Sequence, residues 1–319
     1  MFRSLNGKRR LAAATVGLAL LVAGCGDDGG SGTTSTLSGT INGDGSSTVF
    51  PIMEAVAEDL KIKHPGISVQ VGESGTGGGF EKFCEGETDF SNASRAIKDE
   101  EAAKCAAKGV QYAEFKVASD GLSIVSNKAL PIDCLTVSEL KKTFVASSTV
   151  KKAVDIKAGL PDKELKLFTP GADSGTYDFF LEEVLGKESK YRSDPAVTTS
   201  EDDNLLVQGV EGSNGSGSTG LGLGFFGYAY FQSNADKLNL VGVDDEKGCV
   251  KPSDDTVRDG SYPLSRPLFI YIKTTALARP EVKEMIRFVL TDGRALITEV
   301  GYTQLEDADY QQALGKIPA

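Results

Sequence analysis

A strand, a loop rich in glycine, serine and threonine, and a helix follow one another three times along this chain, and that order restricts the fold more than any other feature. The apolar stretch 37–42 leads through the loop 43–48 into the stretch 49–63, where apolar residues recur at helical spacing. The same order begins again at the strands 67–71 and 165–168. Alternating strands and helices predict a layered α/β protein.

The three loops share a chemistry that suits a small anion. Loop 1 is 43–48, loop 2 is 72–78 and loop 3 is 170–176, and each brings Gly, Ser and Thr to the start of a helix. The first N–H groups of a helix have no partner within it, and the helix dipole makes that end partly positive. One such loop is an ordinary helix cap, but three favour a shared anion site. None continues as Gly-Lys-Ser or Gly-Lys-Thr, which excludes a P-loop nucleotide site.

A division into two lobes would bring the loops together. In open α/β sheets ligands lie at the carboxyl ends of the strands, where these loops are expected. The extended stretches 117–127 and 267–273 are the candidates for two hinge crossings. They predict a lobe 1 of residues 37–118 plus 270–319 and a lobe 2 of residues 119–269, with loop 3 facing loops 1 and 2 across a cleft. The Gly/Ser-rich segment 209–219 is expected to be a surface loop of lobe 2.

Four cysteines remain after the N-terminal segment, and outside the cytoplasm they are expected to form disulfides in one of three pairings. We expect Cys84–Cys105 and Cys134–Cys249, because each pair would then lie within one lobe and leave the hinge free. Metal binding is the alternative, but the chain has no C-x-x-C spacing, and its only histidine, His64, is expected at the surface at a helix end. The sequence therefore predicts no metal site, no cofactor and no Ser-His-Asp or Cys-His catalytic machinery.

The N-terminus predicts export. Arg3 and the cluster 8–10 precede the apolar run 11–23, and this run ends in Val22-Ala23-Gly24-Cys25, which looks like a bacterial lipobox. Residues 1–24 are therefore expected to be a lipoprotein signal peptide, with a lipid on Cys25 that anchors the protein to the outer side of the cell membrane. An ordinary signal peptide with an incidental cysteine is the alternative. Residues 26–36 lack apolar side chains, so the segment 25–36 is expected to form a flexible tether.

The charge of the mature chain limits its partners. Without the four cations of the signal peptide, 30 basic residues stand against 45 acidic ones, a net charge of −15. Nucleic acid and anionic lipid headgroups are thus excluded as main partners. An acidic protein that binds an anion must do so through local dipoles, because its overall field repels the ligand.

Six stretches together resemble one known family. They are Asp44-Gly-Ser-Ser-Thr-Val-Phe-Pro51, Ser74-Gly-Thr-Gly-Gly-Gly-Phe80, Asp89-Phe-Ser-Asn-Ala-Ser-Arg95, Asp120-Gly121, Asp173-Ser-Gly-Thr176 and Leu223-Gly-Phe-Phe-Gly-Tyr228. The family is that of the phosphate-binding protein of the bacterial phosphate ABC transporter, and the resemblance covers essentially the whole mature chain. It implies a two-lobed periplasmic-binding-protein fold of type II, the Venus flytrap. It also implies a monomer that captures inorganic phosphate and delivers it to the permease subunits of the transporter.

The resemblance also implies which residues hold the phosphate oxygens. They come from the three loops: Ser47, Thr48, Ser74, Gly75, Thr76, Ser174, Gly175 and Thr176. One departure concerns charge, because the best-known members have an aspartate at the position of Arg95 and an arginine near that of Pro170. The guanidinium of Arg95 would suit phosphate, since its fork donates two parallel hydrogen bonds. A solvated surface arginine is the alternative.

The carboxylate that accepts the phosphate proton is then unassigned. Such a carboxylate would exclude sulfate, which carries no proton at neutral pH, through an unpaired contact between like charges. Asp120 is the first candidate because it lies at the start of a hinge crossing, and Asp44 is the second; either could instead be an ordinary turn aspartate. Binding of sulfate or molybdate on the same scaffold, a phosphatase activity, and a role as surface receptor or adhesin are the competing functions.

Overall fold

The computed structural model describes residues 37–172, 174–217 and 220–318, which belong to one compact unit of the chain. The expected signal peptide, Cys25 and the tether lie outside the described residues, as does Asp173. No helix within the described ranges combines the length and the apolar character that crossing a bilayer requires.

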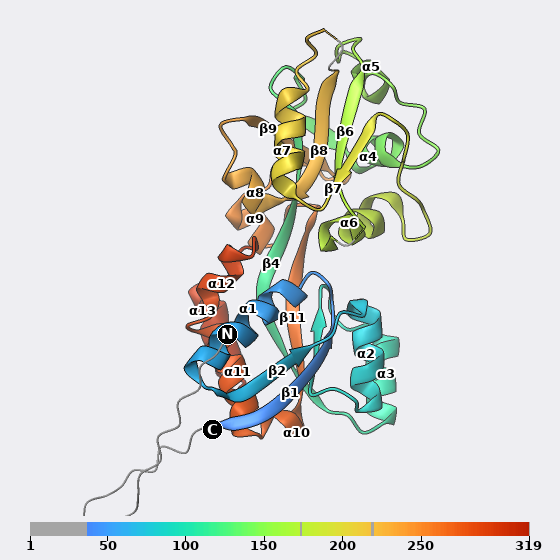
Figure 1. The fold of residues 1–319 in the computed structure, drawn as a ribbon. Coiled ribbons are helices and arrows are strands. Elements are labelled where there is room, and N and C mark those ends of the chain that lie inside the picture. Colours follow the sequence, from blue (N-terminus) through green and yellow to red (C-terminus); the bar gives the residue numbers. More distant parts are fainter. Residues whose placement is uncertain (1–36, 173, 218–219, 319) are drawn as a thin grey trace, which may run out of the picture. The chain divides into compact units, whose positions relative to one another are not determined.

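The first half of the fold is built on a sheet in the order β2-β1-β3-β11-β4 (Figure 1). The strands β1, β2 and β3 are parallel, whereas β11 runs antiparallel to both of its neighbours. The strands are β1 (Ser38–Gly45), β2 (Gly66–Val71), β3 (Phe90–Ala93), β4 (Tyr112–Asn127) and β11 (Ser265–Lys273). The helices of this half are α1 (Phe50–Lys63), α2 (Gly75–Glu85), α3 (Asp99–Ala107), α10 (Thr274–Leu277), α11 (Pro280–Leu290), α12 (Arg294–Glu299) and α13 (Asp307–Leu314).

The second half has its own sheet, in the order β4-β8-β6-β7, with β9 on the other edge of β4. Its further strands are β5 (Cys134–Thr136), β6 (Leu165–Pro170), β7 (Val197–Ser200), β8 (Leu221–Gly227), β9 (Leu238–Asp244) and β10 (Cys249–Val250). Its helices are α4 (Val137–Phe144), α5 (Ala153–Ile156), α6 (Gly175–Phe180), the π-helix η1 (Leu181–Leu185), α7 (Asp203–Gly212), α8 (Tyr228–Gln232) and α9 (Asp254–Arg258).

Two long strands connect the halves. The strand β4 pairs with β11 up to Gly121 and with β8 from Leu122 onward, so one strand belongs to both sheets. In Figure 1, β4 and β11 run side by side between the two sheets. These are the stretches that the sequence predicted as hinge crossings. The predicted lobe boundaries, at 118/119 and 269/270, fall within these two strands.

Each half has a hydrophobic core on both faces of its sheet. Along β11, Ile270 and Ile272 belong to the core under α1 and α11, whereas Phe269 and Tyr271 pack on the opposite face against α2. This alternation is what a strand buried on both sides requires. In the second half, residues of α4 and η1 pack on one face and residues of α7 on the other.

The disulfides lie within these halves in the predicted pairing. Cys84 of α2 is bonded to Cys105 of α3, and Cys134 of β5 is bonded to Cys249 of β10. The first bridge covalently joins the two helices that cover one face of the first sheet. The second closes a loop of 115 residues in sequence separation, so it restricts the unfolded chain more strongly.

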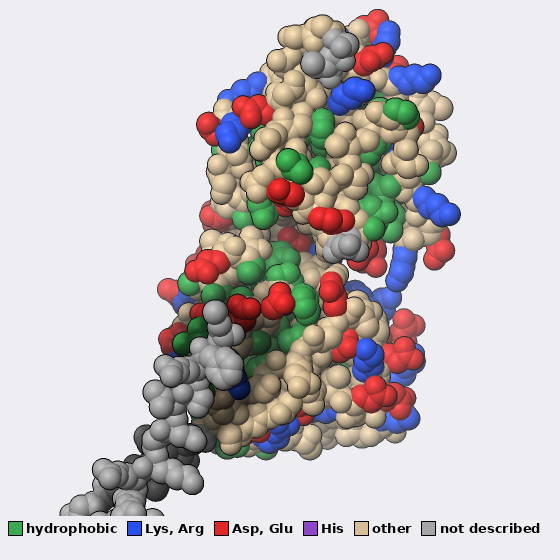
Figure 2. Space-filling model, in the orientation of Figure 1, with side chains coloured by type: hydrophobic (Ala, Val, Ile, Leu, Met, Phe, Trp, Pro, Cys, Tyr) green, Lys and Arg blue, Asp and Glu red, His purple; other side chains and the backbone are tan. Residues whose placement is uncertain are grey.

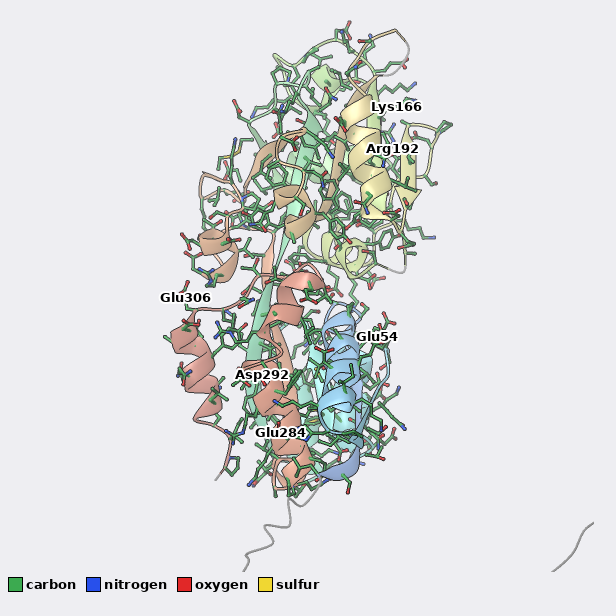
Figure 3. The ribbon with its side chains drawn as sticks, turned by 60° about the vertical axis from the view of Figure 1, so that its left-hand side comes forward. Glu54, Lys166, Arg192, Glu284, Asp292 and Glu306 are labelled. Atoms are coloured by element: carbon green, nitrogen blue, oxygen red, sulfur yellow. A yellow bond between two sulfur atoms is a disulfide. The ribbon has the colours of Figure 1, made fainter. Side chains whose placement is uncertain are left out.

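The single histidine of the chain, His64, lies at the end of α1. His64 is the C-cap of this helix, as predicted, and its Nε2 lies 3.1 Å from Oε1 of Glu284 in α11. Lys63 Nζ donates to Oδ2 of Asp292 at 2.6 Å, so two contacts attach the end of α1 to the segment around α11 (Figure 3).

One local prediction was wrong. Part of the segment 209–219, expected as a surface loop, continues the helix α7 to Gly212. Val210 is fully buried against the second sheet. The burial of this apolar face outweighs the low helix propensity of glycine at 209 and 212.

Candidate functional site

Loops 1 and 2 lie side by side at the carboxyl ends of the parallel strands β1 and β2, which pair in register. The N–H of Ser46 donates to the carbonyl of Asn92 at 3.0 Å and attaches loop 1 to β3. The carboxylate of Asp44 holds loop 2: it accepts hydrogen bonds from the backbone N–H of Ser74 at 3.0 Å and from the Ser74 hydroxyl. Lys82 of α2 donates to the same carboxylate at 2.6 Å.

These partners decide the charge of Asp44. Burial on its own raises the pKa of Asp44, but the hydrogen bonds from Lys82 and Ser74 outweigh this effect and hold the pKa below its ordinary value. Asp44 is therefore ionised at neutral pH, and it orients the start of α2.

Loop 2 enters α2 through a glycine with a left-handed backbone. Gly75 has φ +75°, a region that side chains disfavour, and a Cβ there would meet no atom within 4 Å. The constraint is therefore conformational rather than steric. The hydroxyl of Thr76 then accepts a hydrogen bond from the N–H of Ser94 at 3.1 Å and contacts the Ser94 hydroxyl at 3.1 Å. Loop 2 is thus joined to the end of β3, where Arg95 follows.

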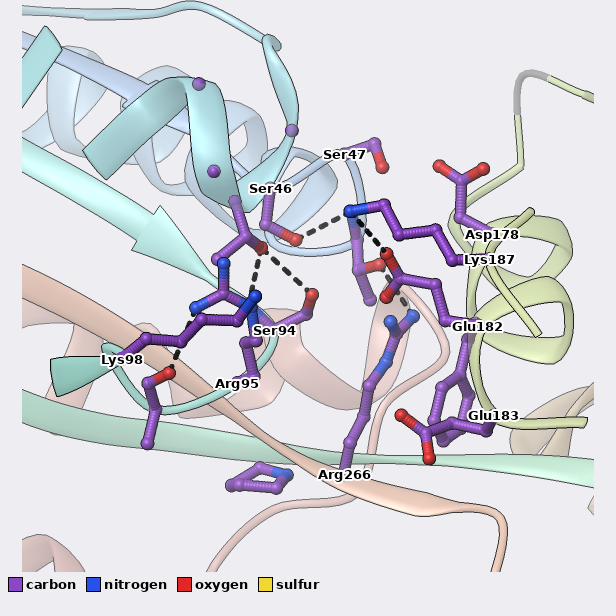
Figure 4. Close-up of a pocket in the computed structure, with 18 of the residues that line it drawn as sticks. Ser46, Ser47, Ser94, Arg95, Lys98, Asp178, Glu182, Glu183, Lys187 and Arg266 are labelled. Carbon is purple, nitrogen blue, oxygen red and sulfur yellow. Dashed lines mark hydrogen bonds and ion pairs between the residues drawn. The ribbon is translucent and has the colours of Figure 1, made fainter. Parts of the chain in front are cut away.

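A cavity of about 700 Å³ opens in front of loops 1 and 2, and we call it cavity 1 (Figure 4). Four cations line it: Arg95, Lys98, Lys187 and Arg266. Three carboxyl groups from α6 and η1 line the opposite wall: Asp178, Glu182 and Glu183. The cavity also takes in the loop residues Ser46, Ser47, Thr48, Ser74, Gly75, Thr76, Gly77 and Gly78, together with Ser94, Ala96, Phe179, Ser265 and Pro267.

Arg95 is held by a carboxylate that the sequence did not indicate. Its Nη1 and Nη2 each donate to one oxygen of Glu101 at 2.8 Å, and Nη1 also donates to the carbonyl of Ala96 at 3.1 Å. A guanidinium has five N–H groups. Among the described residues, these bonds leave the Nε–H and one Nη2–H of Arg95 for a ligand. The hydrogen bond and charge of Glu101 raise the pKa of Arg95, so the guanidinium stays charged.

A buried ion pair lies where the two halves meet. Arg266 of β11 donates from Nε to Oδ2 of Asp120 in β4 at 3.0 Å. Its Nη2 donates to the Thr48 hydroxyl at 2.7 Å and to the carbonyl of Gly175 at 2.9 Å. Loop 1 and loop 3 are in direct contact here, since a Cβ on Gly175 would lie 2.4 Å from Oγ1 of Thr48. Burial raises the pKa of Asp120, and the nearby guanidinium of Arg266 works against that rise.

A second cavity, of about 440 Å³, lies on the other side of this contact, and we call it cavity 2. Five acidic residues line it and no lysine, arginine or histidine does so among the described residues; the five are Glu54, Glu73, Asp120, Glu201 and Asp203. Burial, and then the charges of Asp202 and Glu201, raise the pKa of Asp203 to about 6. Figure 2 shows acidic side chains gathered around the junction of the two halves on this face.

The ten residues that the sequence predicted for the site are divided between the two cavities. Cavity 1 holds five of them that cavity 2 lacks: Thr48, Ser74, Gly75, Thr76 and Arg95. Cavity 2 holds Asp120, Ser174, Gly175 and Thr176, and Ser47 lines both. The two groups meet at the contact between Thr48 and Gly175.

Sequence reasoning missed Arg266, Glu101 and the charged residues of α6 and η1. The first had a usable signal, because Arg266 directly precedes the apolar stretch Pro267–Ile272, which was predicted as a hinge crossing. A charge in such a place requires a partner. The others follow helical patterns that also fit solvated surfaces. The described residues contain no group of three or more His, Cys, Asp and Glu side chains arranged to hold a metal ion.

Comparison with known proteins gives consistent matches. The family model described as "PBP superfamily domain" matches residues 30–293. The "Phosphate-binding protein PstS" of Staphylococcus haemolyticus is 40% identical over 315 residues, which cover 96% of each chain.

Solved structures agree with the sequence matches. The crystal structure of "a possible phosphate binding protein" from Planctomyces limnophilus has a TM-score of 0.82 and 47% identity, and the match covers 89% of this chain and 100% of that one. The "ABC-type phosphate transport receptor" from Vibrio cholerae has a TM-score of 0.65 and 25% identity, covering 83% of this chain and 100% of that one.

Proposed function

Because the chain belongs to the PBP superfamily and, within it, to the PstS family of phosphate-binding proteins, we propose that it captures inorganic phosphate between its two halves and delivers it to the permease of an ABC transporter. The fold is the type II periplasmic-binding-protein fold predicted from the sequence. The family consists of transport receptors rather than enzymes, also as predicted.

The arrangement of charge in cavity 1 is the single observation that carries this proposal. Four cations and three carboxyl groups line this cavity, a small excess of positive charge in a chain whose net charge is strongly negative, whereas cavity 2 is lined by five acidic residues and by no cation among the described residues. The cations lie beside the Gly, Ser and Thr residues of loops 1 and 2, and a local excess of positive charge attracts an anion. We therefore infer that phosphate enters through cavity 1 and approaches loops 1 and 2.

Donors from both halves would then hold the anion. The donors of the first half are Ser47 and Thr48, the stretch 74–76 and Arg95. The donors of the second half are the stretch 174–176, at the contact between Thr48 and Gly175. Cavity 1 has a volume of about 700 Å³, far more than one phosphate fills. A movement along β4 and β11 would open and close the cleft between loops 1 and 3, with lobes bounded as the sequence predicts. The closed form is favoured by the ligand because it alone makes both sets of bonds.

Calorimetric titration tests the proposal. We expect the full chain carrying Cys25→Ser to bind one phosphate with a dissociation constant of about 1 µM or tighter, as roughly eight hydrogen bonds of about 1 kcal/mol each would allow. Sulfate and molybdate are titrated in parallel. Preferential binding of either anion would contradict the assignment of phosphate as the ligand, but not the proposed capture of an anion between the two halves. Absence of binding by all three anions would contradict the proposal and favour a receptor or adhesin.

Discrimination between phosphate and sulfate is a second testable consequence. The carboxyls of Asp120 and Asp44 are already bonded, to Arg266 and to Ser74 with Lys82. Asp178 lines cavity 1 with an exposed side chain, and partial desolvation followed by the charge of Glu182 raises its pKa. We therefore assign the acceptance of the phosphate proton to Asp178, and to Asp120 the role of holding Arg266.

The variant Asp178→Asn is expected to gain sulfate affinity by about tenfold at pH 7, because it removes a repulsive contact of about 1.4 kcal/mol. In the unaltered protein, sulfate exclusion should weaken as the pH falls, since Asp178 then takes up a proton of its own. Glu183→Gln, on the same wall of the cavity, is the matched control. Equal sulfate exclusion by Asp178→Asn and the unaltered protein would place the acceptor elsewhere, and Asp44→Asn and Asp120→Asn would then be compared.

The place of action is the outer side of the cell membrane. The lipobox-like sequence at Cys25 supports a lipid anchor, and the segment 25–36 would serve as its tether. We propose that the protein acts there as a monomer. Incorporation of labelled palmitate that persists in Cys25→Ser would contradict the assignment of the anchor to this residue.

A further inference from the structure

The ion pair of Asp120 and Arg266 lies at the point where the chain passes from one sheet to the other. The two residues face each other in the register of β4 and β11. Two positions after Asp120, Leu122 already pairs with the second sheet. Arg266 is 8% exposed and Asp120 is 3% exposed. A buried arginine at a crossing strand has to be compensated by its neighbours in every state of the protein.

The two ends of the guanidinium have partners of different kinds. The Nε end is bonded to Asp120 on the adjacent strand, and this contact lies within the crossing itself. The Nη2 end donates to Thr48 of loop 1 and to Gly175 of loop 3. Thr48 precedes α1 of the first half, and Gly175 begins α6 of the second. One nitrogen therefore connects the two halves directly.

The surroundings keep this nitrogen in place. The guanidinium carbon lies 4.1 Å from the centre of the Phe179 ring, a cation–π contact from α6. The hydroxyl of Thr48 uses its oxygen to accept from Arg266, so its single hydrogen is left to donate. Arg266 thus orients the Thr48 hydroxyl, which lines cavity 1, and leaves its hydrogen free to point at an anion. The anion can then bind this hydroxyl while the bond between Thr48 and Arg266 remains.

Opening of the cleft would change the hydrogen bonds at only one end of the Arg266 guanidinium. The bond to Asp120 joins two adjacent strands and is kept, whereas separation of loops 1 and 3 breaks at least one of the two Nη2 bonds. Bonds in which one partner is ionised are about twice as strong as neutral ones. The closed form thereby gains an interaction that exists without any ligand.

We propose that Arg266, held by Asp120, is a latch that stabilises the closed arrangement of loops 1 and 3 before phosphate binds. Arg266 is a positioning residue, which raises the fraction of molecules competent to bind. The apparent affinity of a ligand is reduced by whatever fraction of the protein is not competent. The effect on affinity rests on the proposed function, but the effect on the conformational equilibrium does not.

Spin labels on the two halves measure this equilibrium. Ile62 of α1 is 79% exposed and Leu205 of α7 is 56% exposed, so Ile62→Cys and Leu205→Cys accept labels without disturbing a core. The labels are attached to the full chain carrying Cys25→Ser, with both disulfides oxidised. Distance distributions are recorded without phosphate and with inorganic phosphate at saturation.

In the absence of phosphate, the fraction of molecules with the label separation of this structure is expected to be severalfold smaller in Arg266→Gln than in the unaltered protein. Its phosphate affinity should fall by the same factor, in proportion to the lost closed fraction. Thr48→Val removes the acceptor and leaves the ion pair intact, and it should shift the phosphate-free distribution in the same direction. Arg287→Gln, on the exposed face of α11, is the matched control and should leave the distribution unchanged.

The result that would overturn the latch is a phosphate-free distribution that is the same in Arg266→Gln, Thr48→Val and the unaltered protein, whatever happens to affinity. Thr48→Val keeps the proposal testable if Arg266→Gln does not fold. Failure of the unaltered protein to bind phosphate would contradict the proposed function alone, because the phosphate-free comparison still decides whether Arg266 holds the loops together.

Discussion

Replacement of Arg95 by alanine is expected to weaken phosphate binding by about a hundredfold, or about 3 kcal/mol. Two effects combine in this loss. The anion loses the N–H groups of Arg95 that Glu101 and Ala96 do not use. In addition, Glu101 loses the partner that lowers its pKa, and a carboxylate without its counter-ion is left beside the wall of cavity 1. An unpaired negative charge near the site repels phosphate.

A double-mutant cycle separates the two effects by calorimetric titration. Arg95→Ala combined with Glu101→Gln should recover part of the affinity that Arg95→Ala loses, because the unpaired charge is removed as well. Arg287→Ala is the matched control, since this arginine is exposed on α11, far along the chain from the loops. Phosphate affinity within threefold of the unaltered protein in Arg95→Ala would show that this arginine is a surface residue and no ligand.

Replacement of Gly79 by alanine is expected to lower the free energy of unfolding by about 3 kcal/mol and to weaken phosphate binding at the same time. A Cβ at this position of α2 would lie 2.4 Å from Cα of Gly45 and 3.0 Å from the carbonyl oxygen of Asp44. Both are backbone atoms, so no side-chain rotation relieves the clash. The helix α2 has to move away from β1 and takes loop 2 with it.

Thermal and denaturant unfolding measure the first effect, and titration measures the second. Gly77→Ala is the control for stability: it lies in the same helix, and a Cβ there meets no atom within 4 Å. Since alanine has the higher helix propensity, this variant should be as stable as the unaltered protein or slightly more stable. Equal stability of Gly79→Ala and Gly77→Ala would contradict the close packing of α2 on the end of β1.

The features that could be predicted from the sequence depend on short stretches of chain. The order of strand, loop and helix at 37–63 follows from apolar spacing and glycine content, and β1 and α1 form there. The two crossing strands were found because long extended stretches have few alternative structures. The disulfide pairing followed from one physical requirement, that a bridge should not restrain the hinge. The limit of this reasoning is the segment 209–219, where burial of Val210 outweighed the glycine content.

The contacts that join the loops could not be predicted in this way. Arg266 meets Thr48, 218 positions away in sequence, and Asp120, 146 positions away. Arg95 and Glu101 are only six positions apart, yet their pairing requires the turn between β3 and α3 to bring the carboxylate under the guanidinium.

Sequence patterns of period two and 3.6 report which face of an element is buried. They contain no information on which distant side chain occupies the space opposite that face. For this reason the residue types of an anion-binding site could be predicted from the sequence. The partner of each charge, and with it the roles of Asp120 and Arg266, followed only from packing between elements.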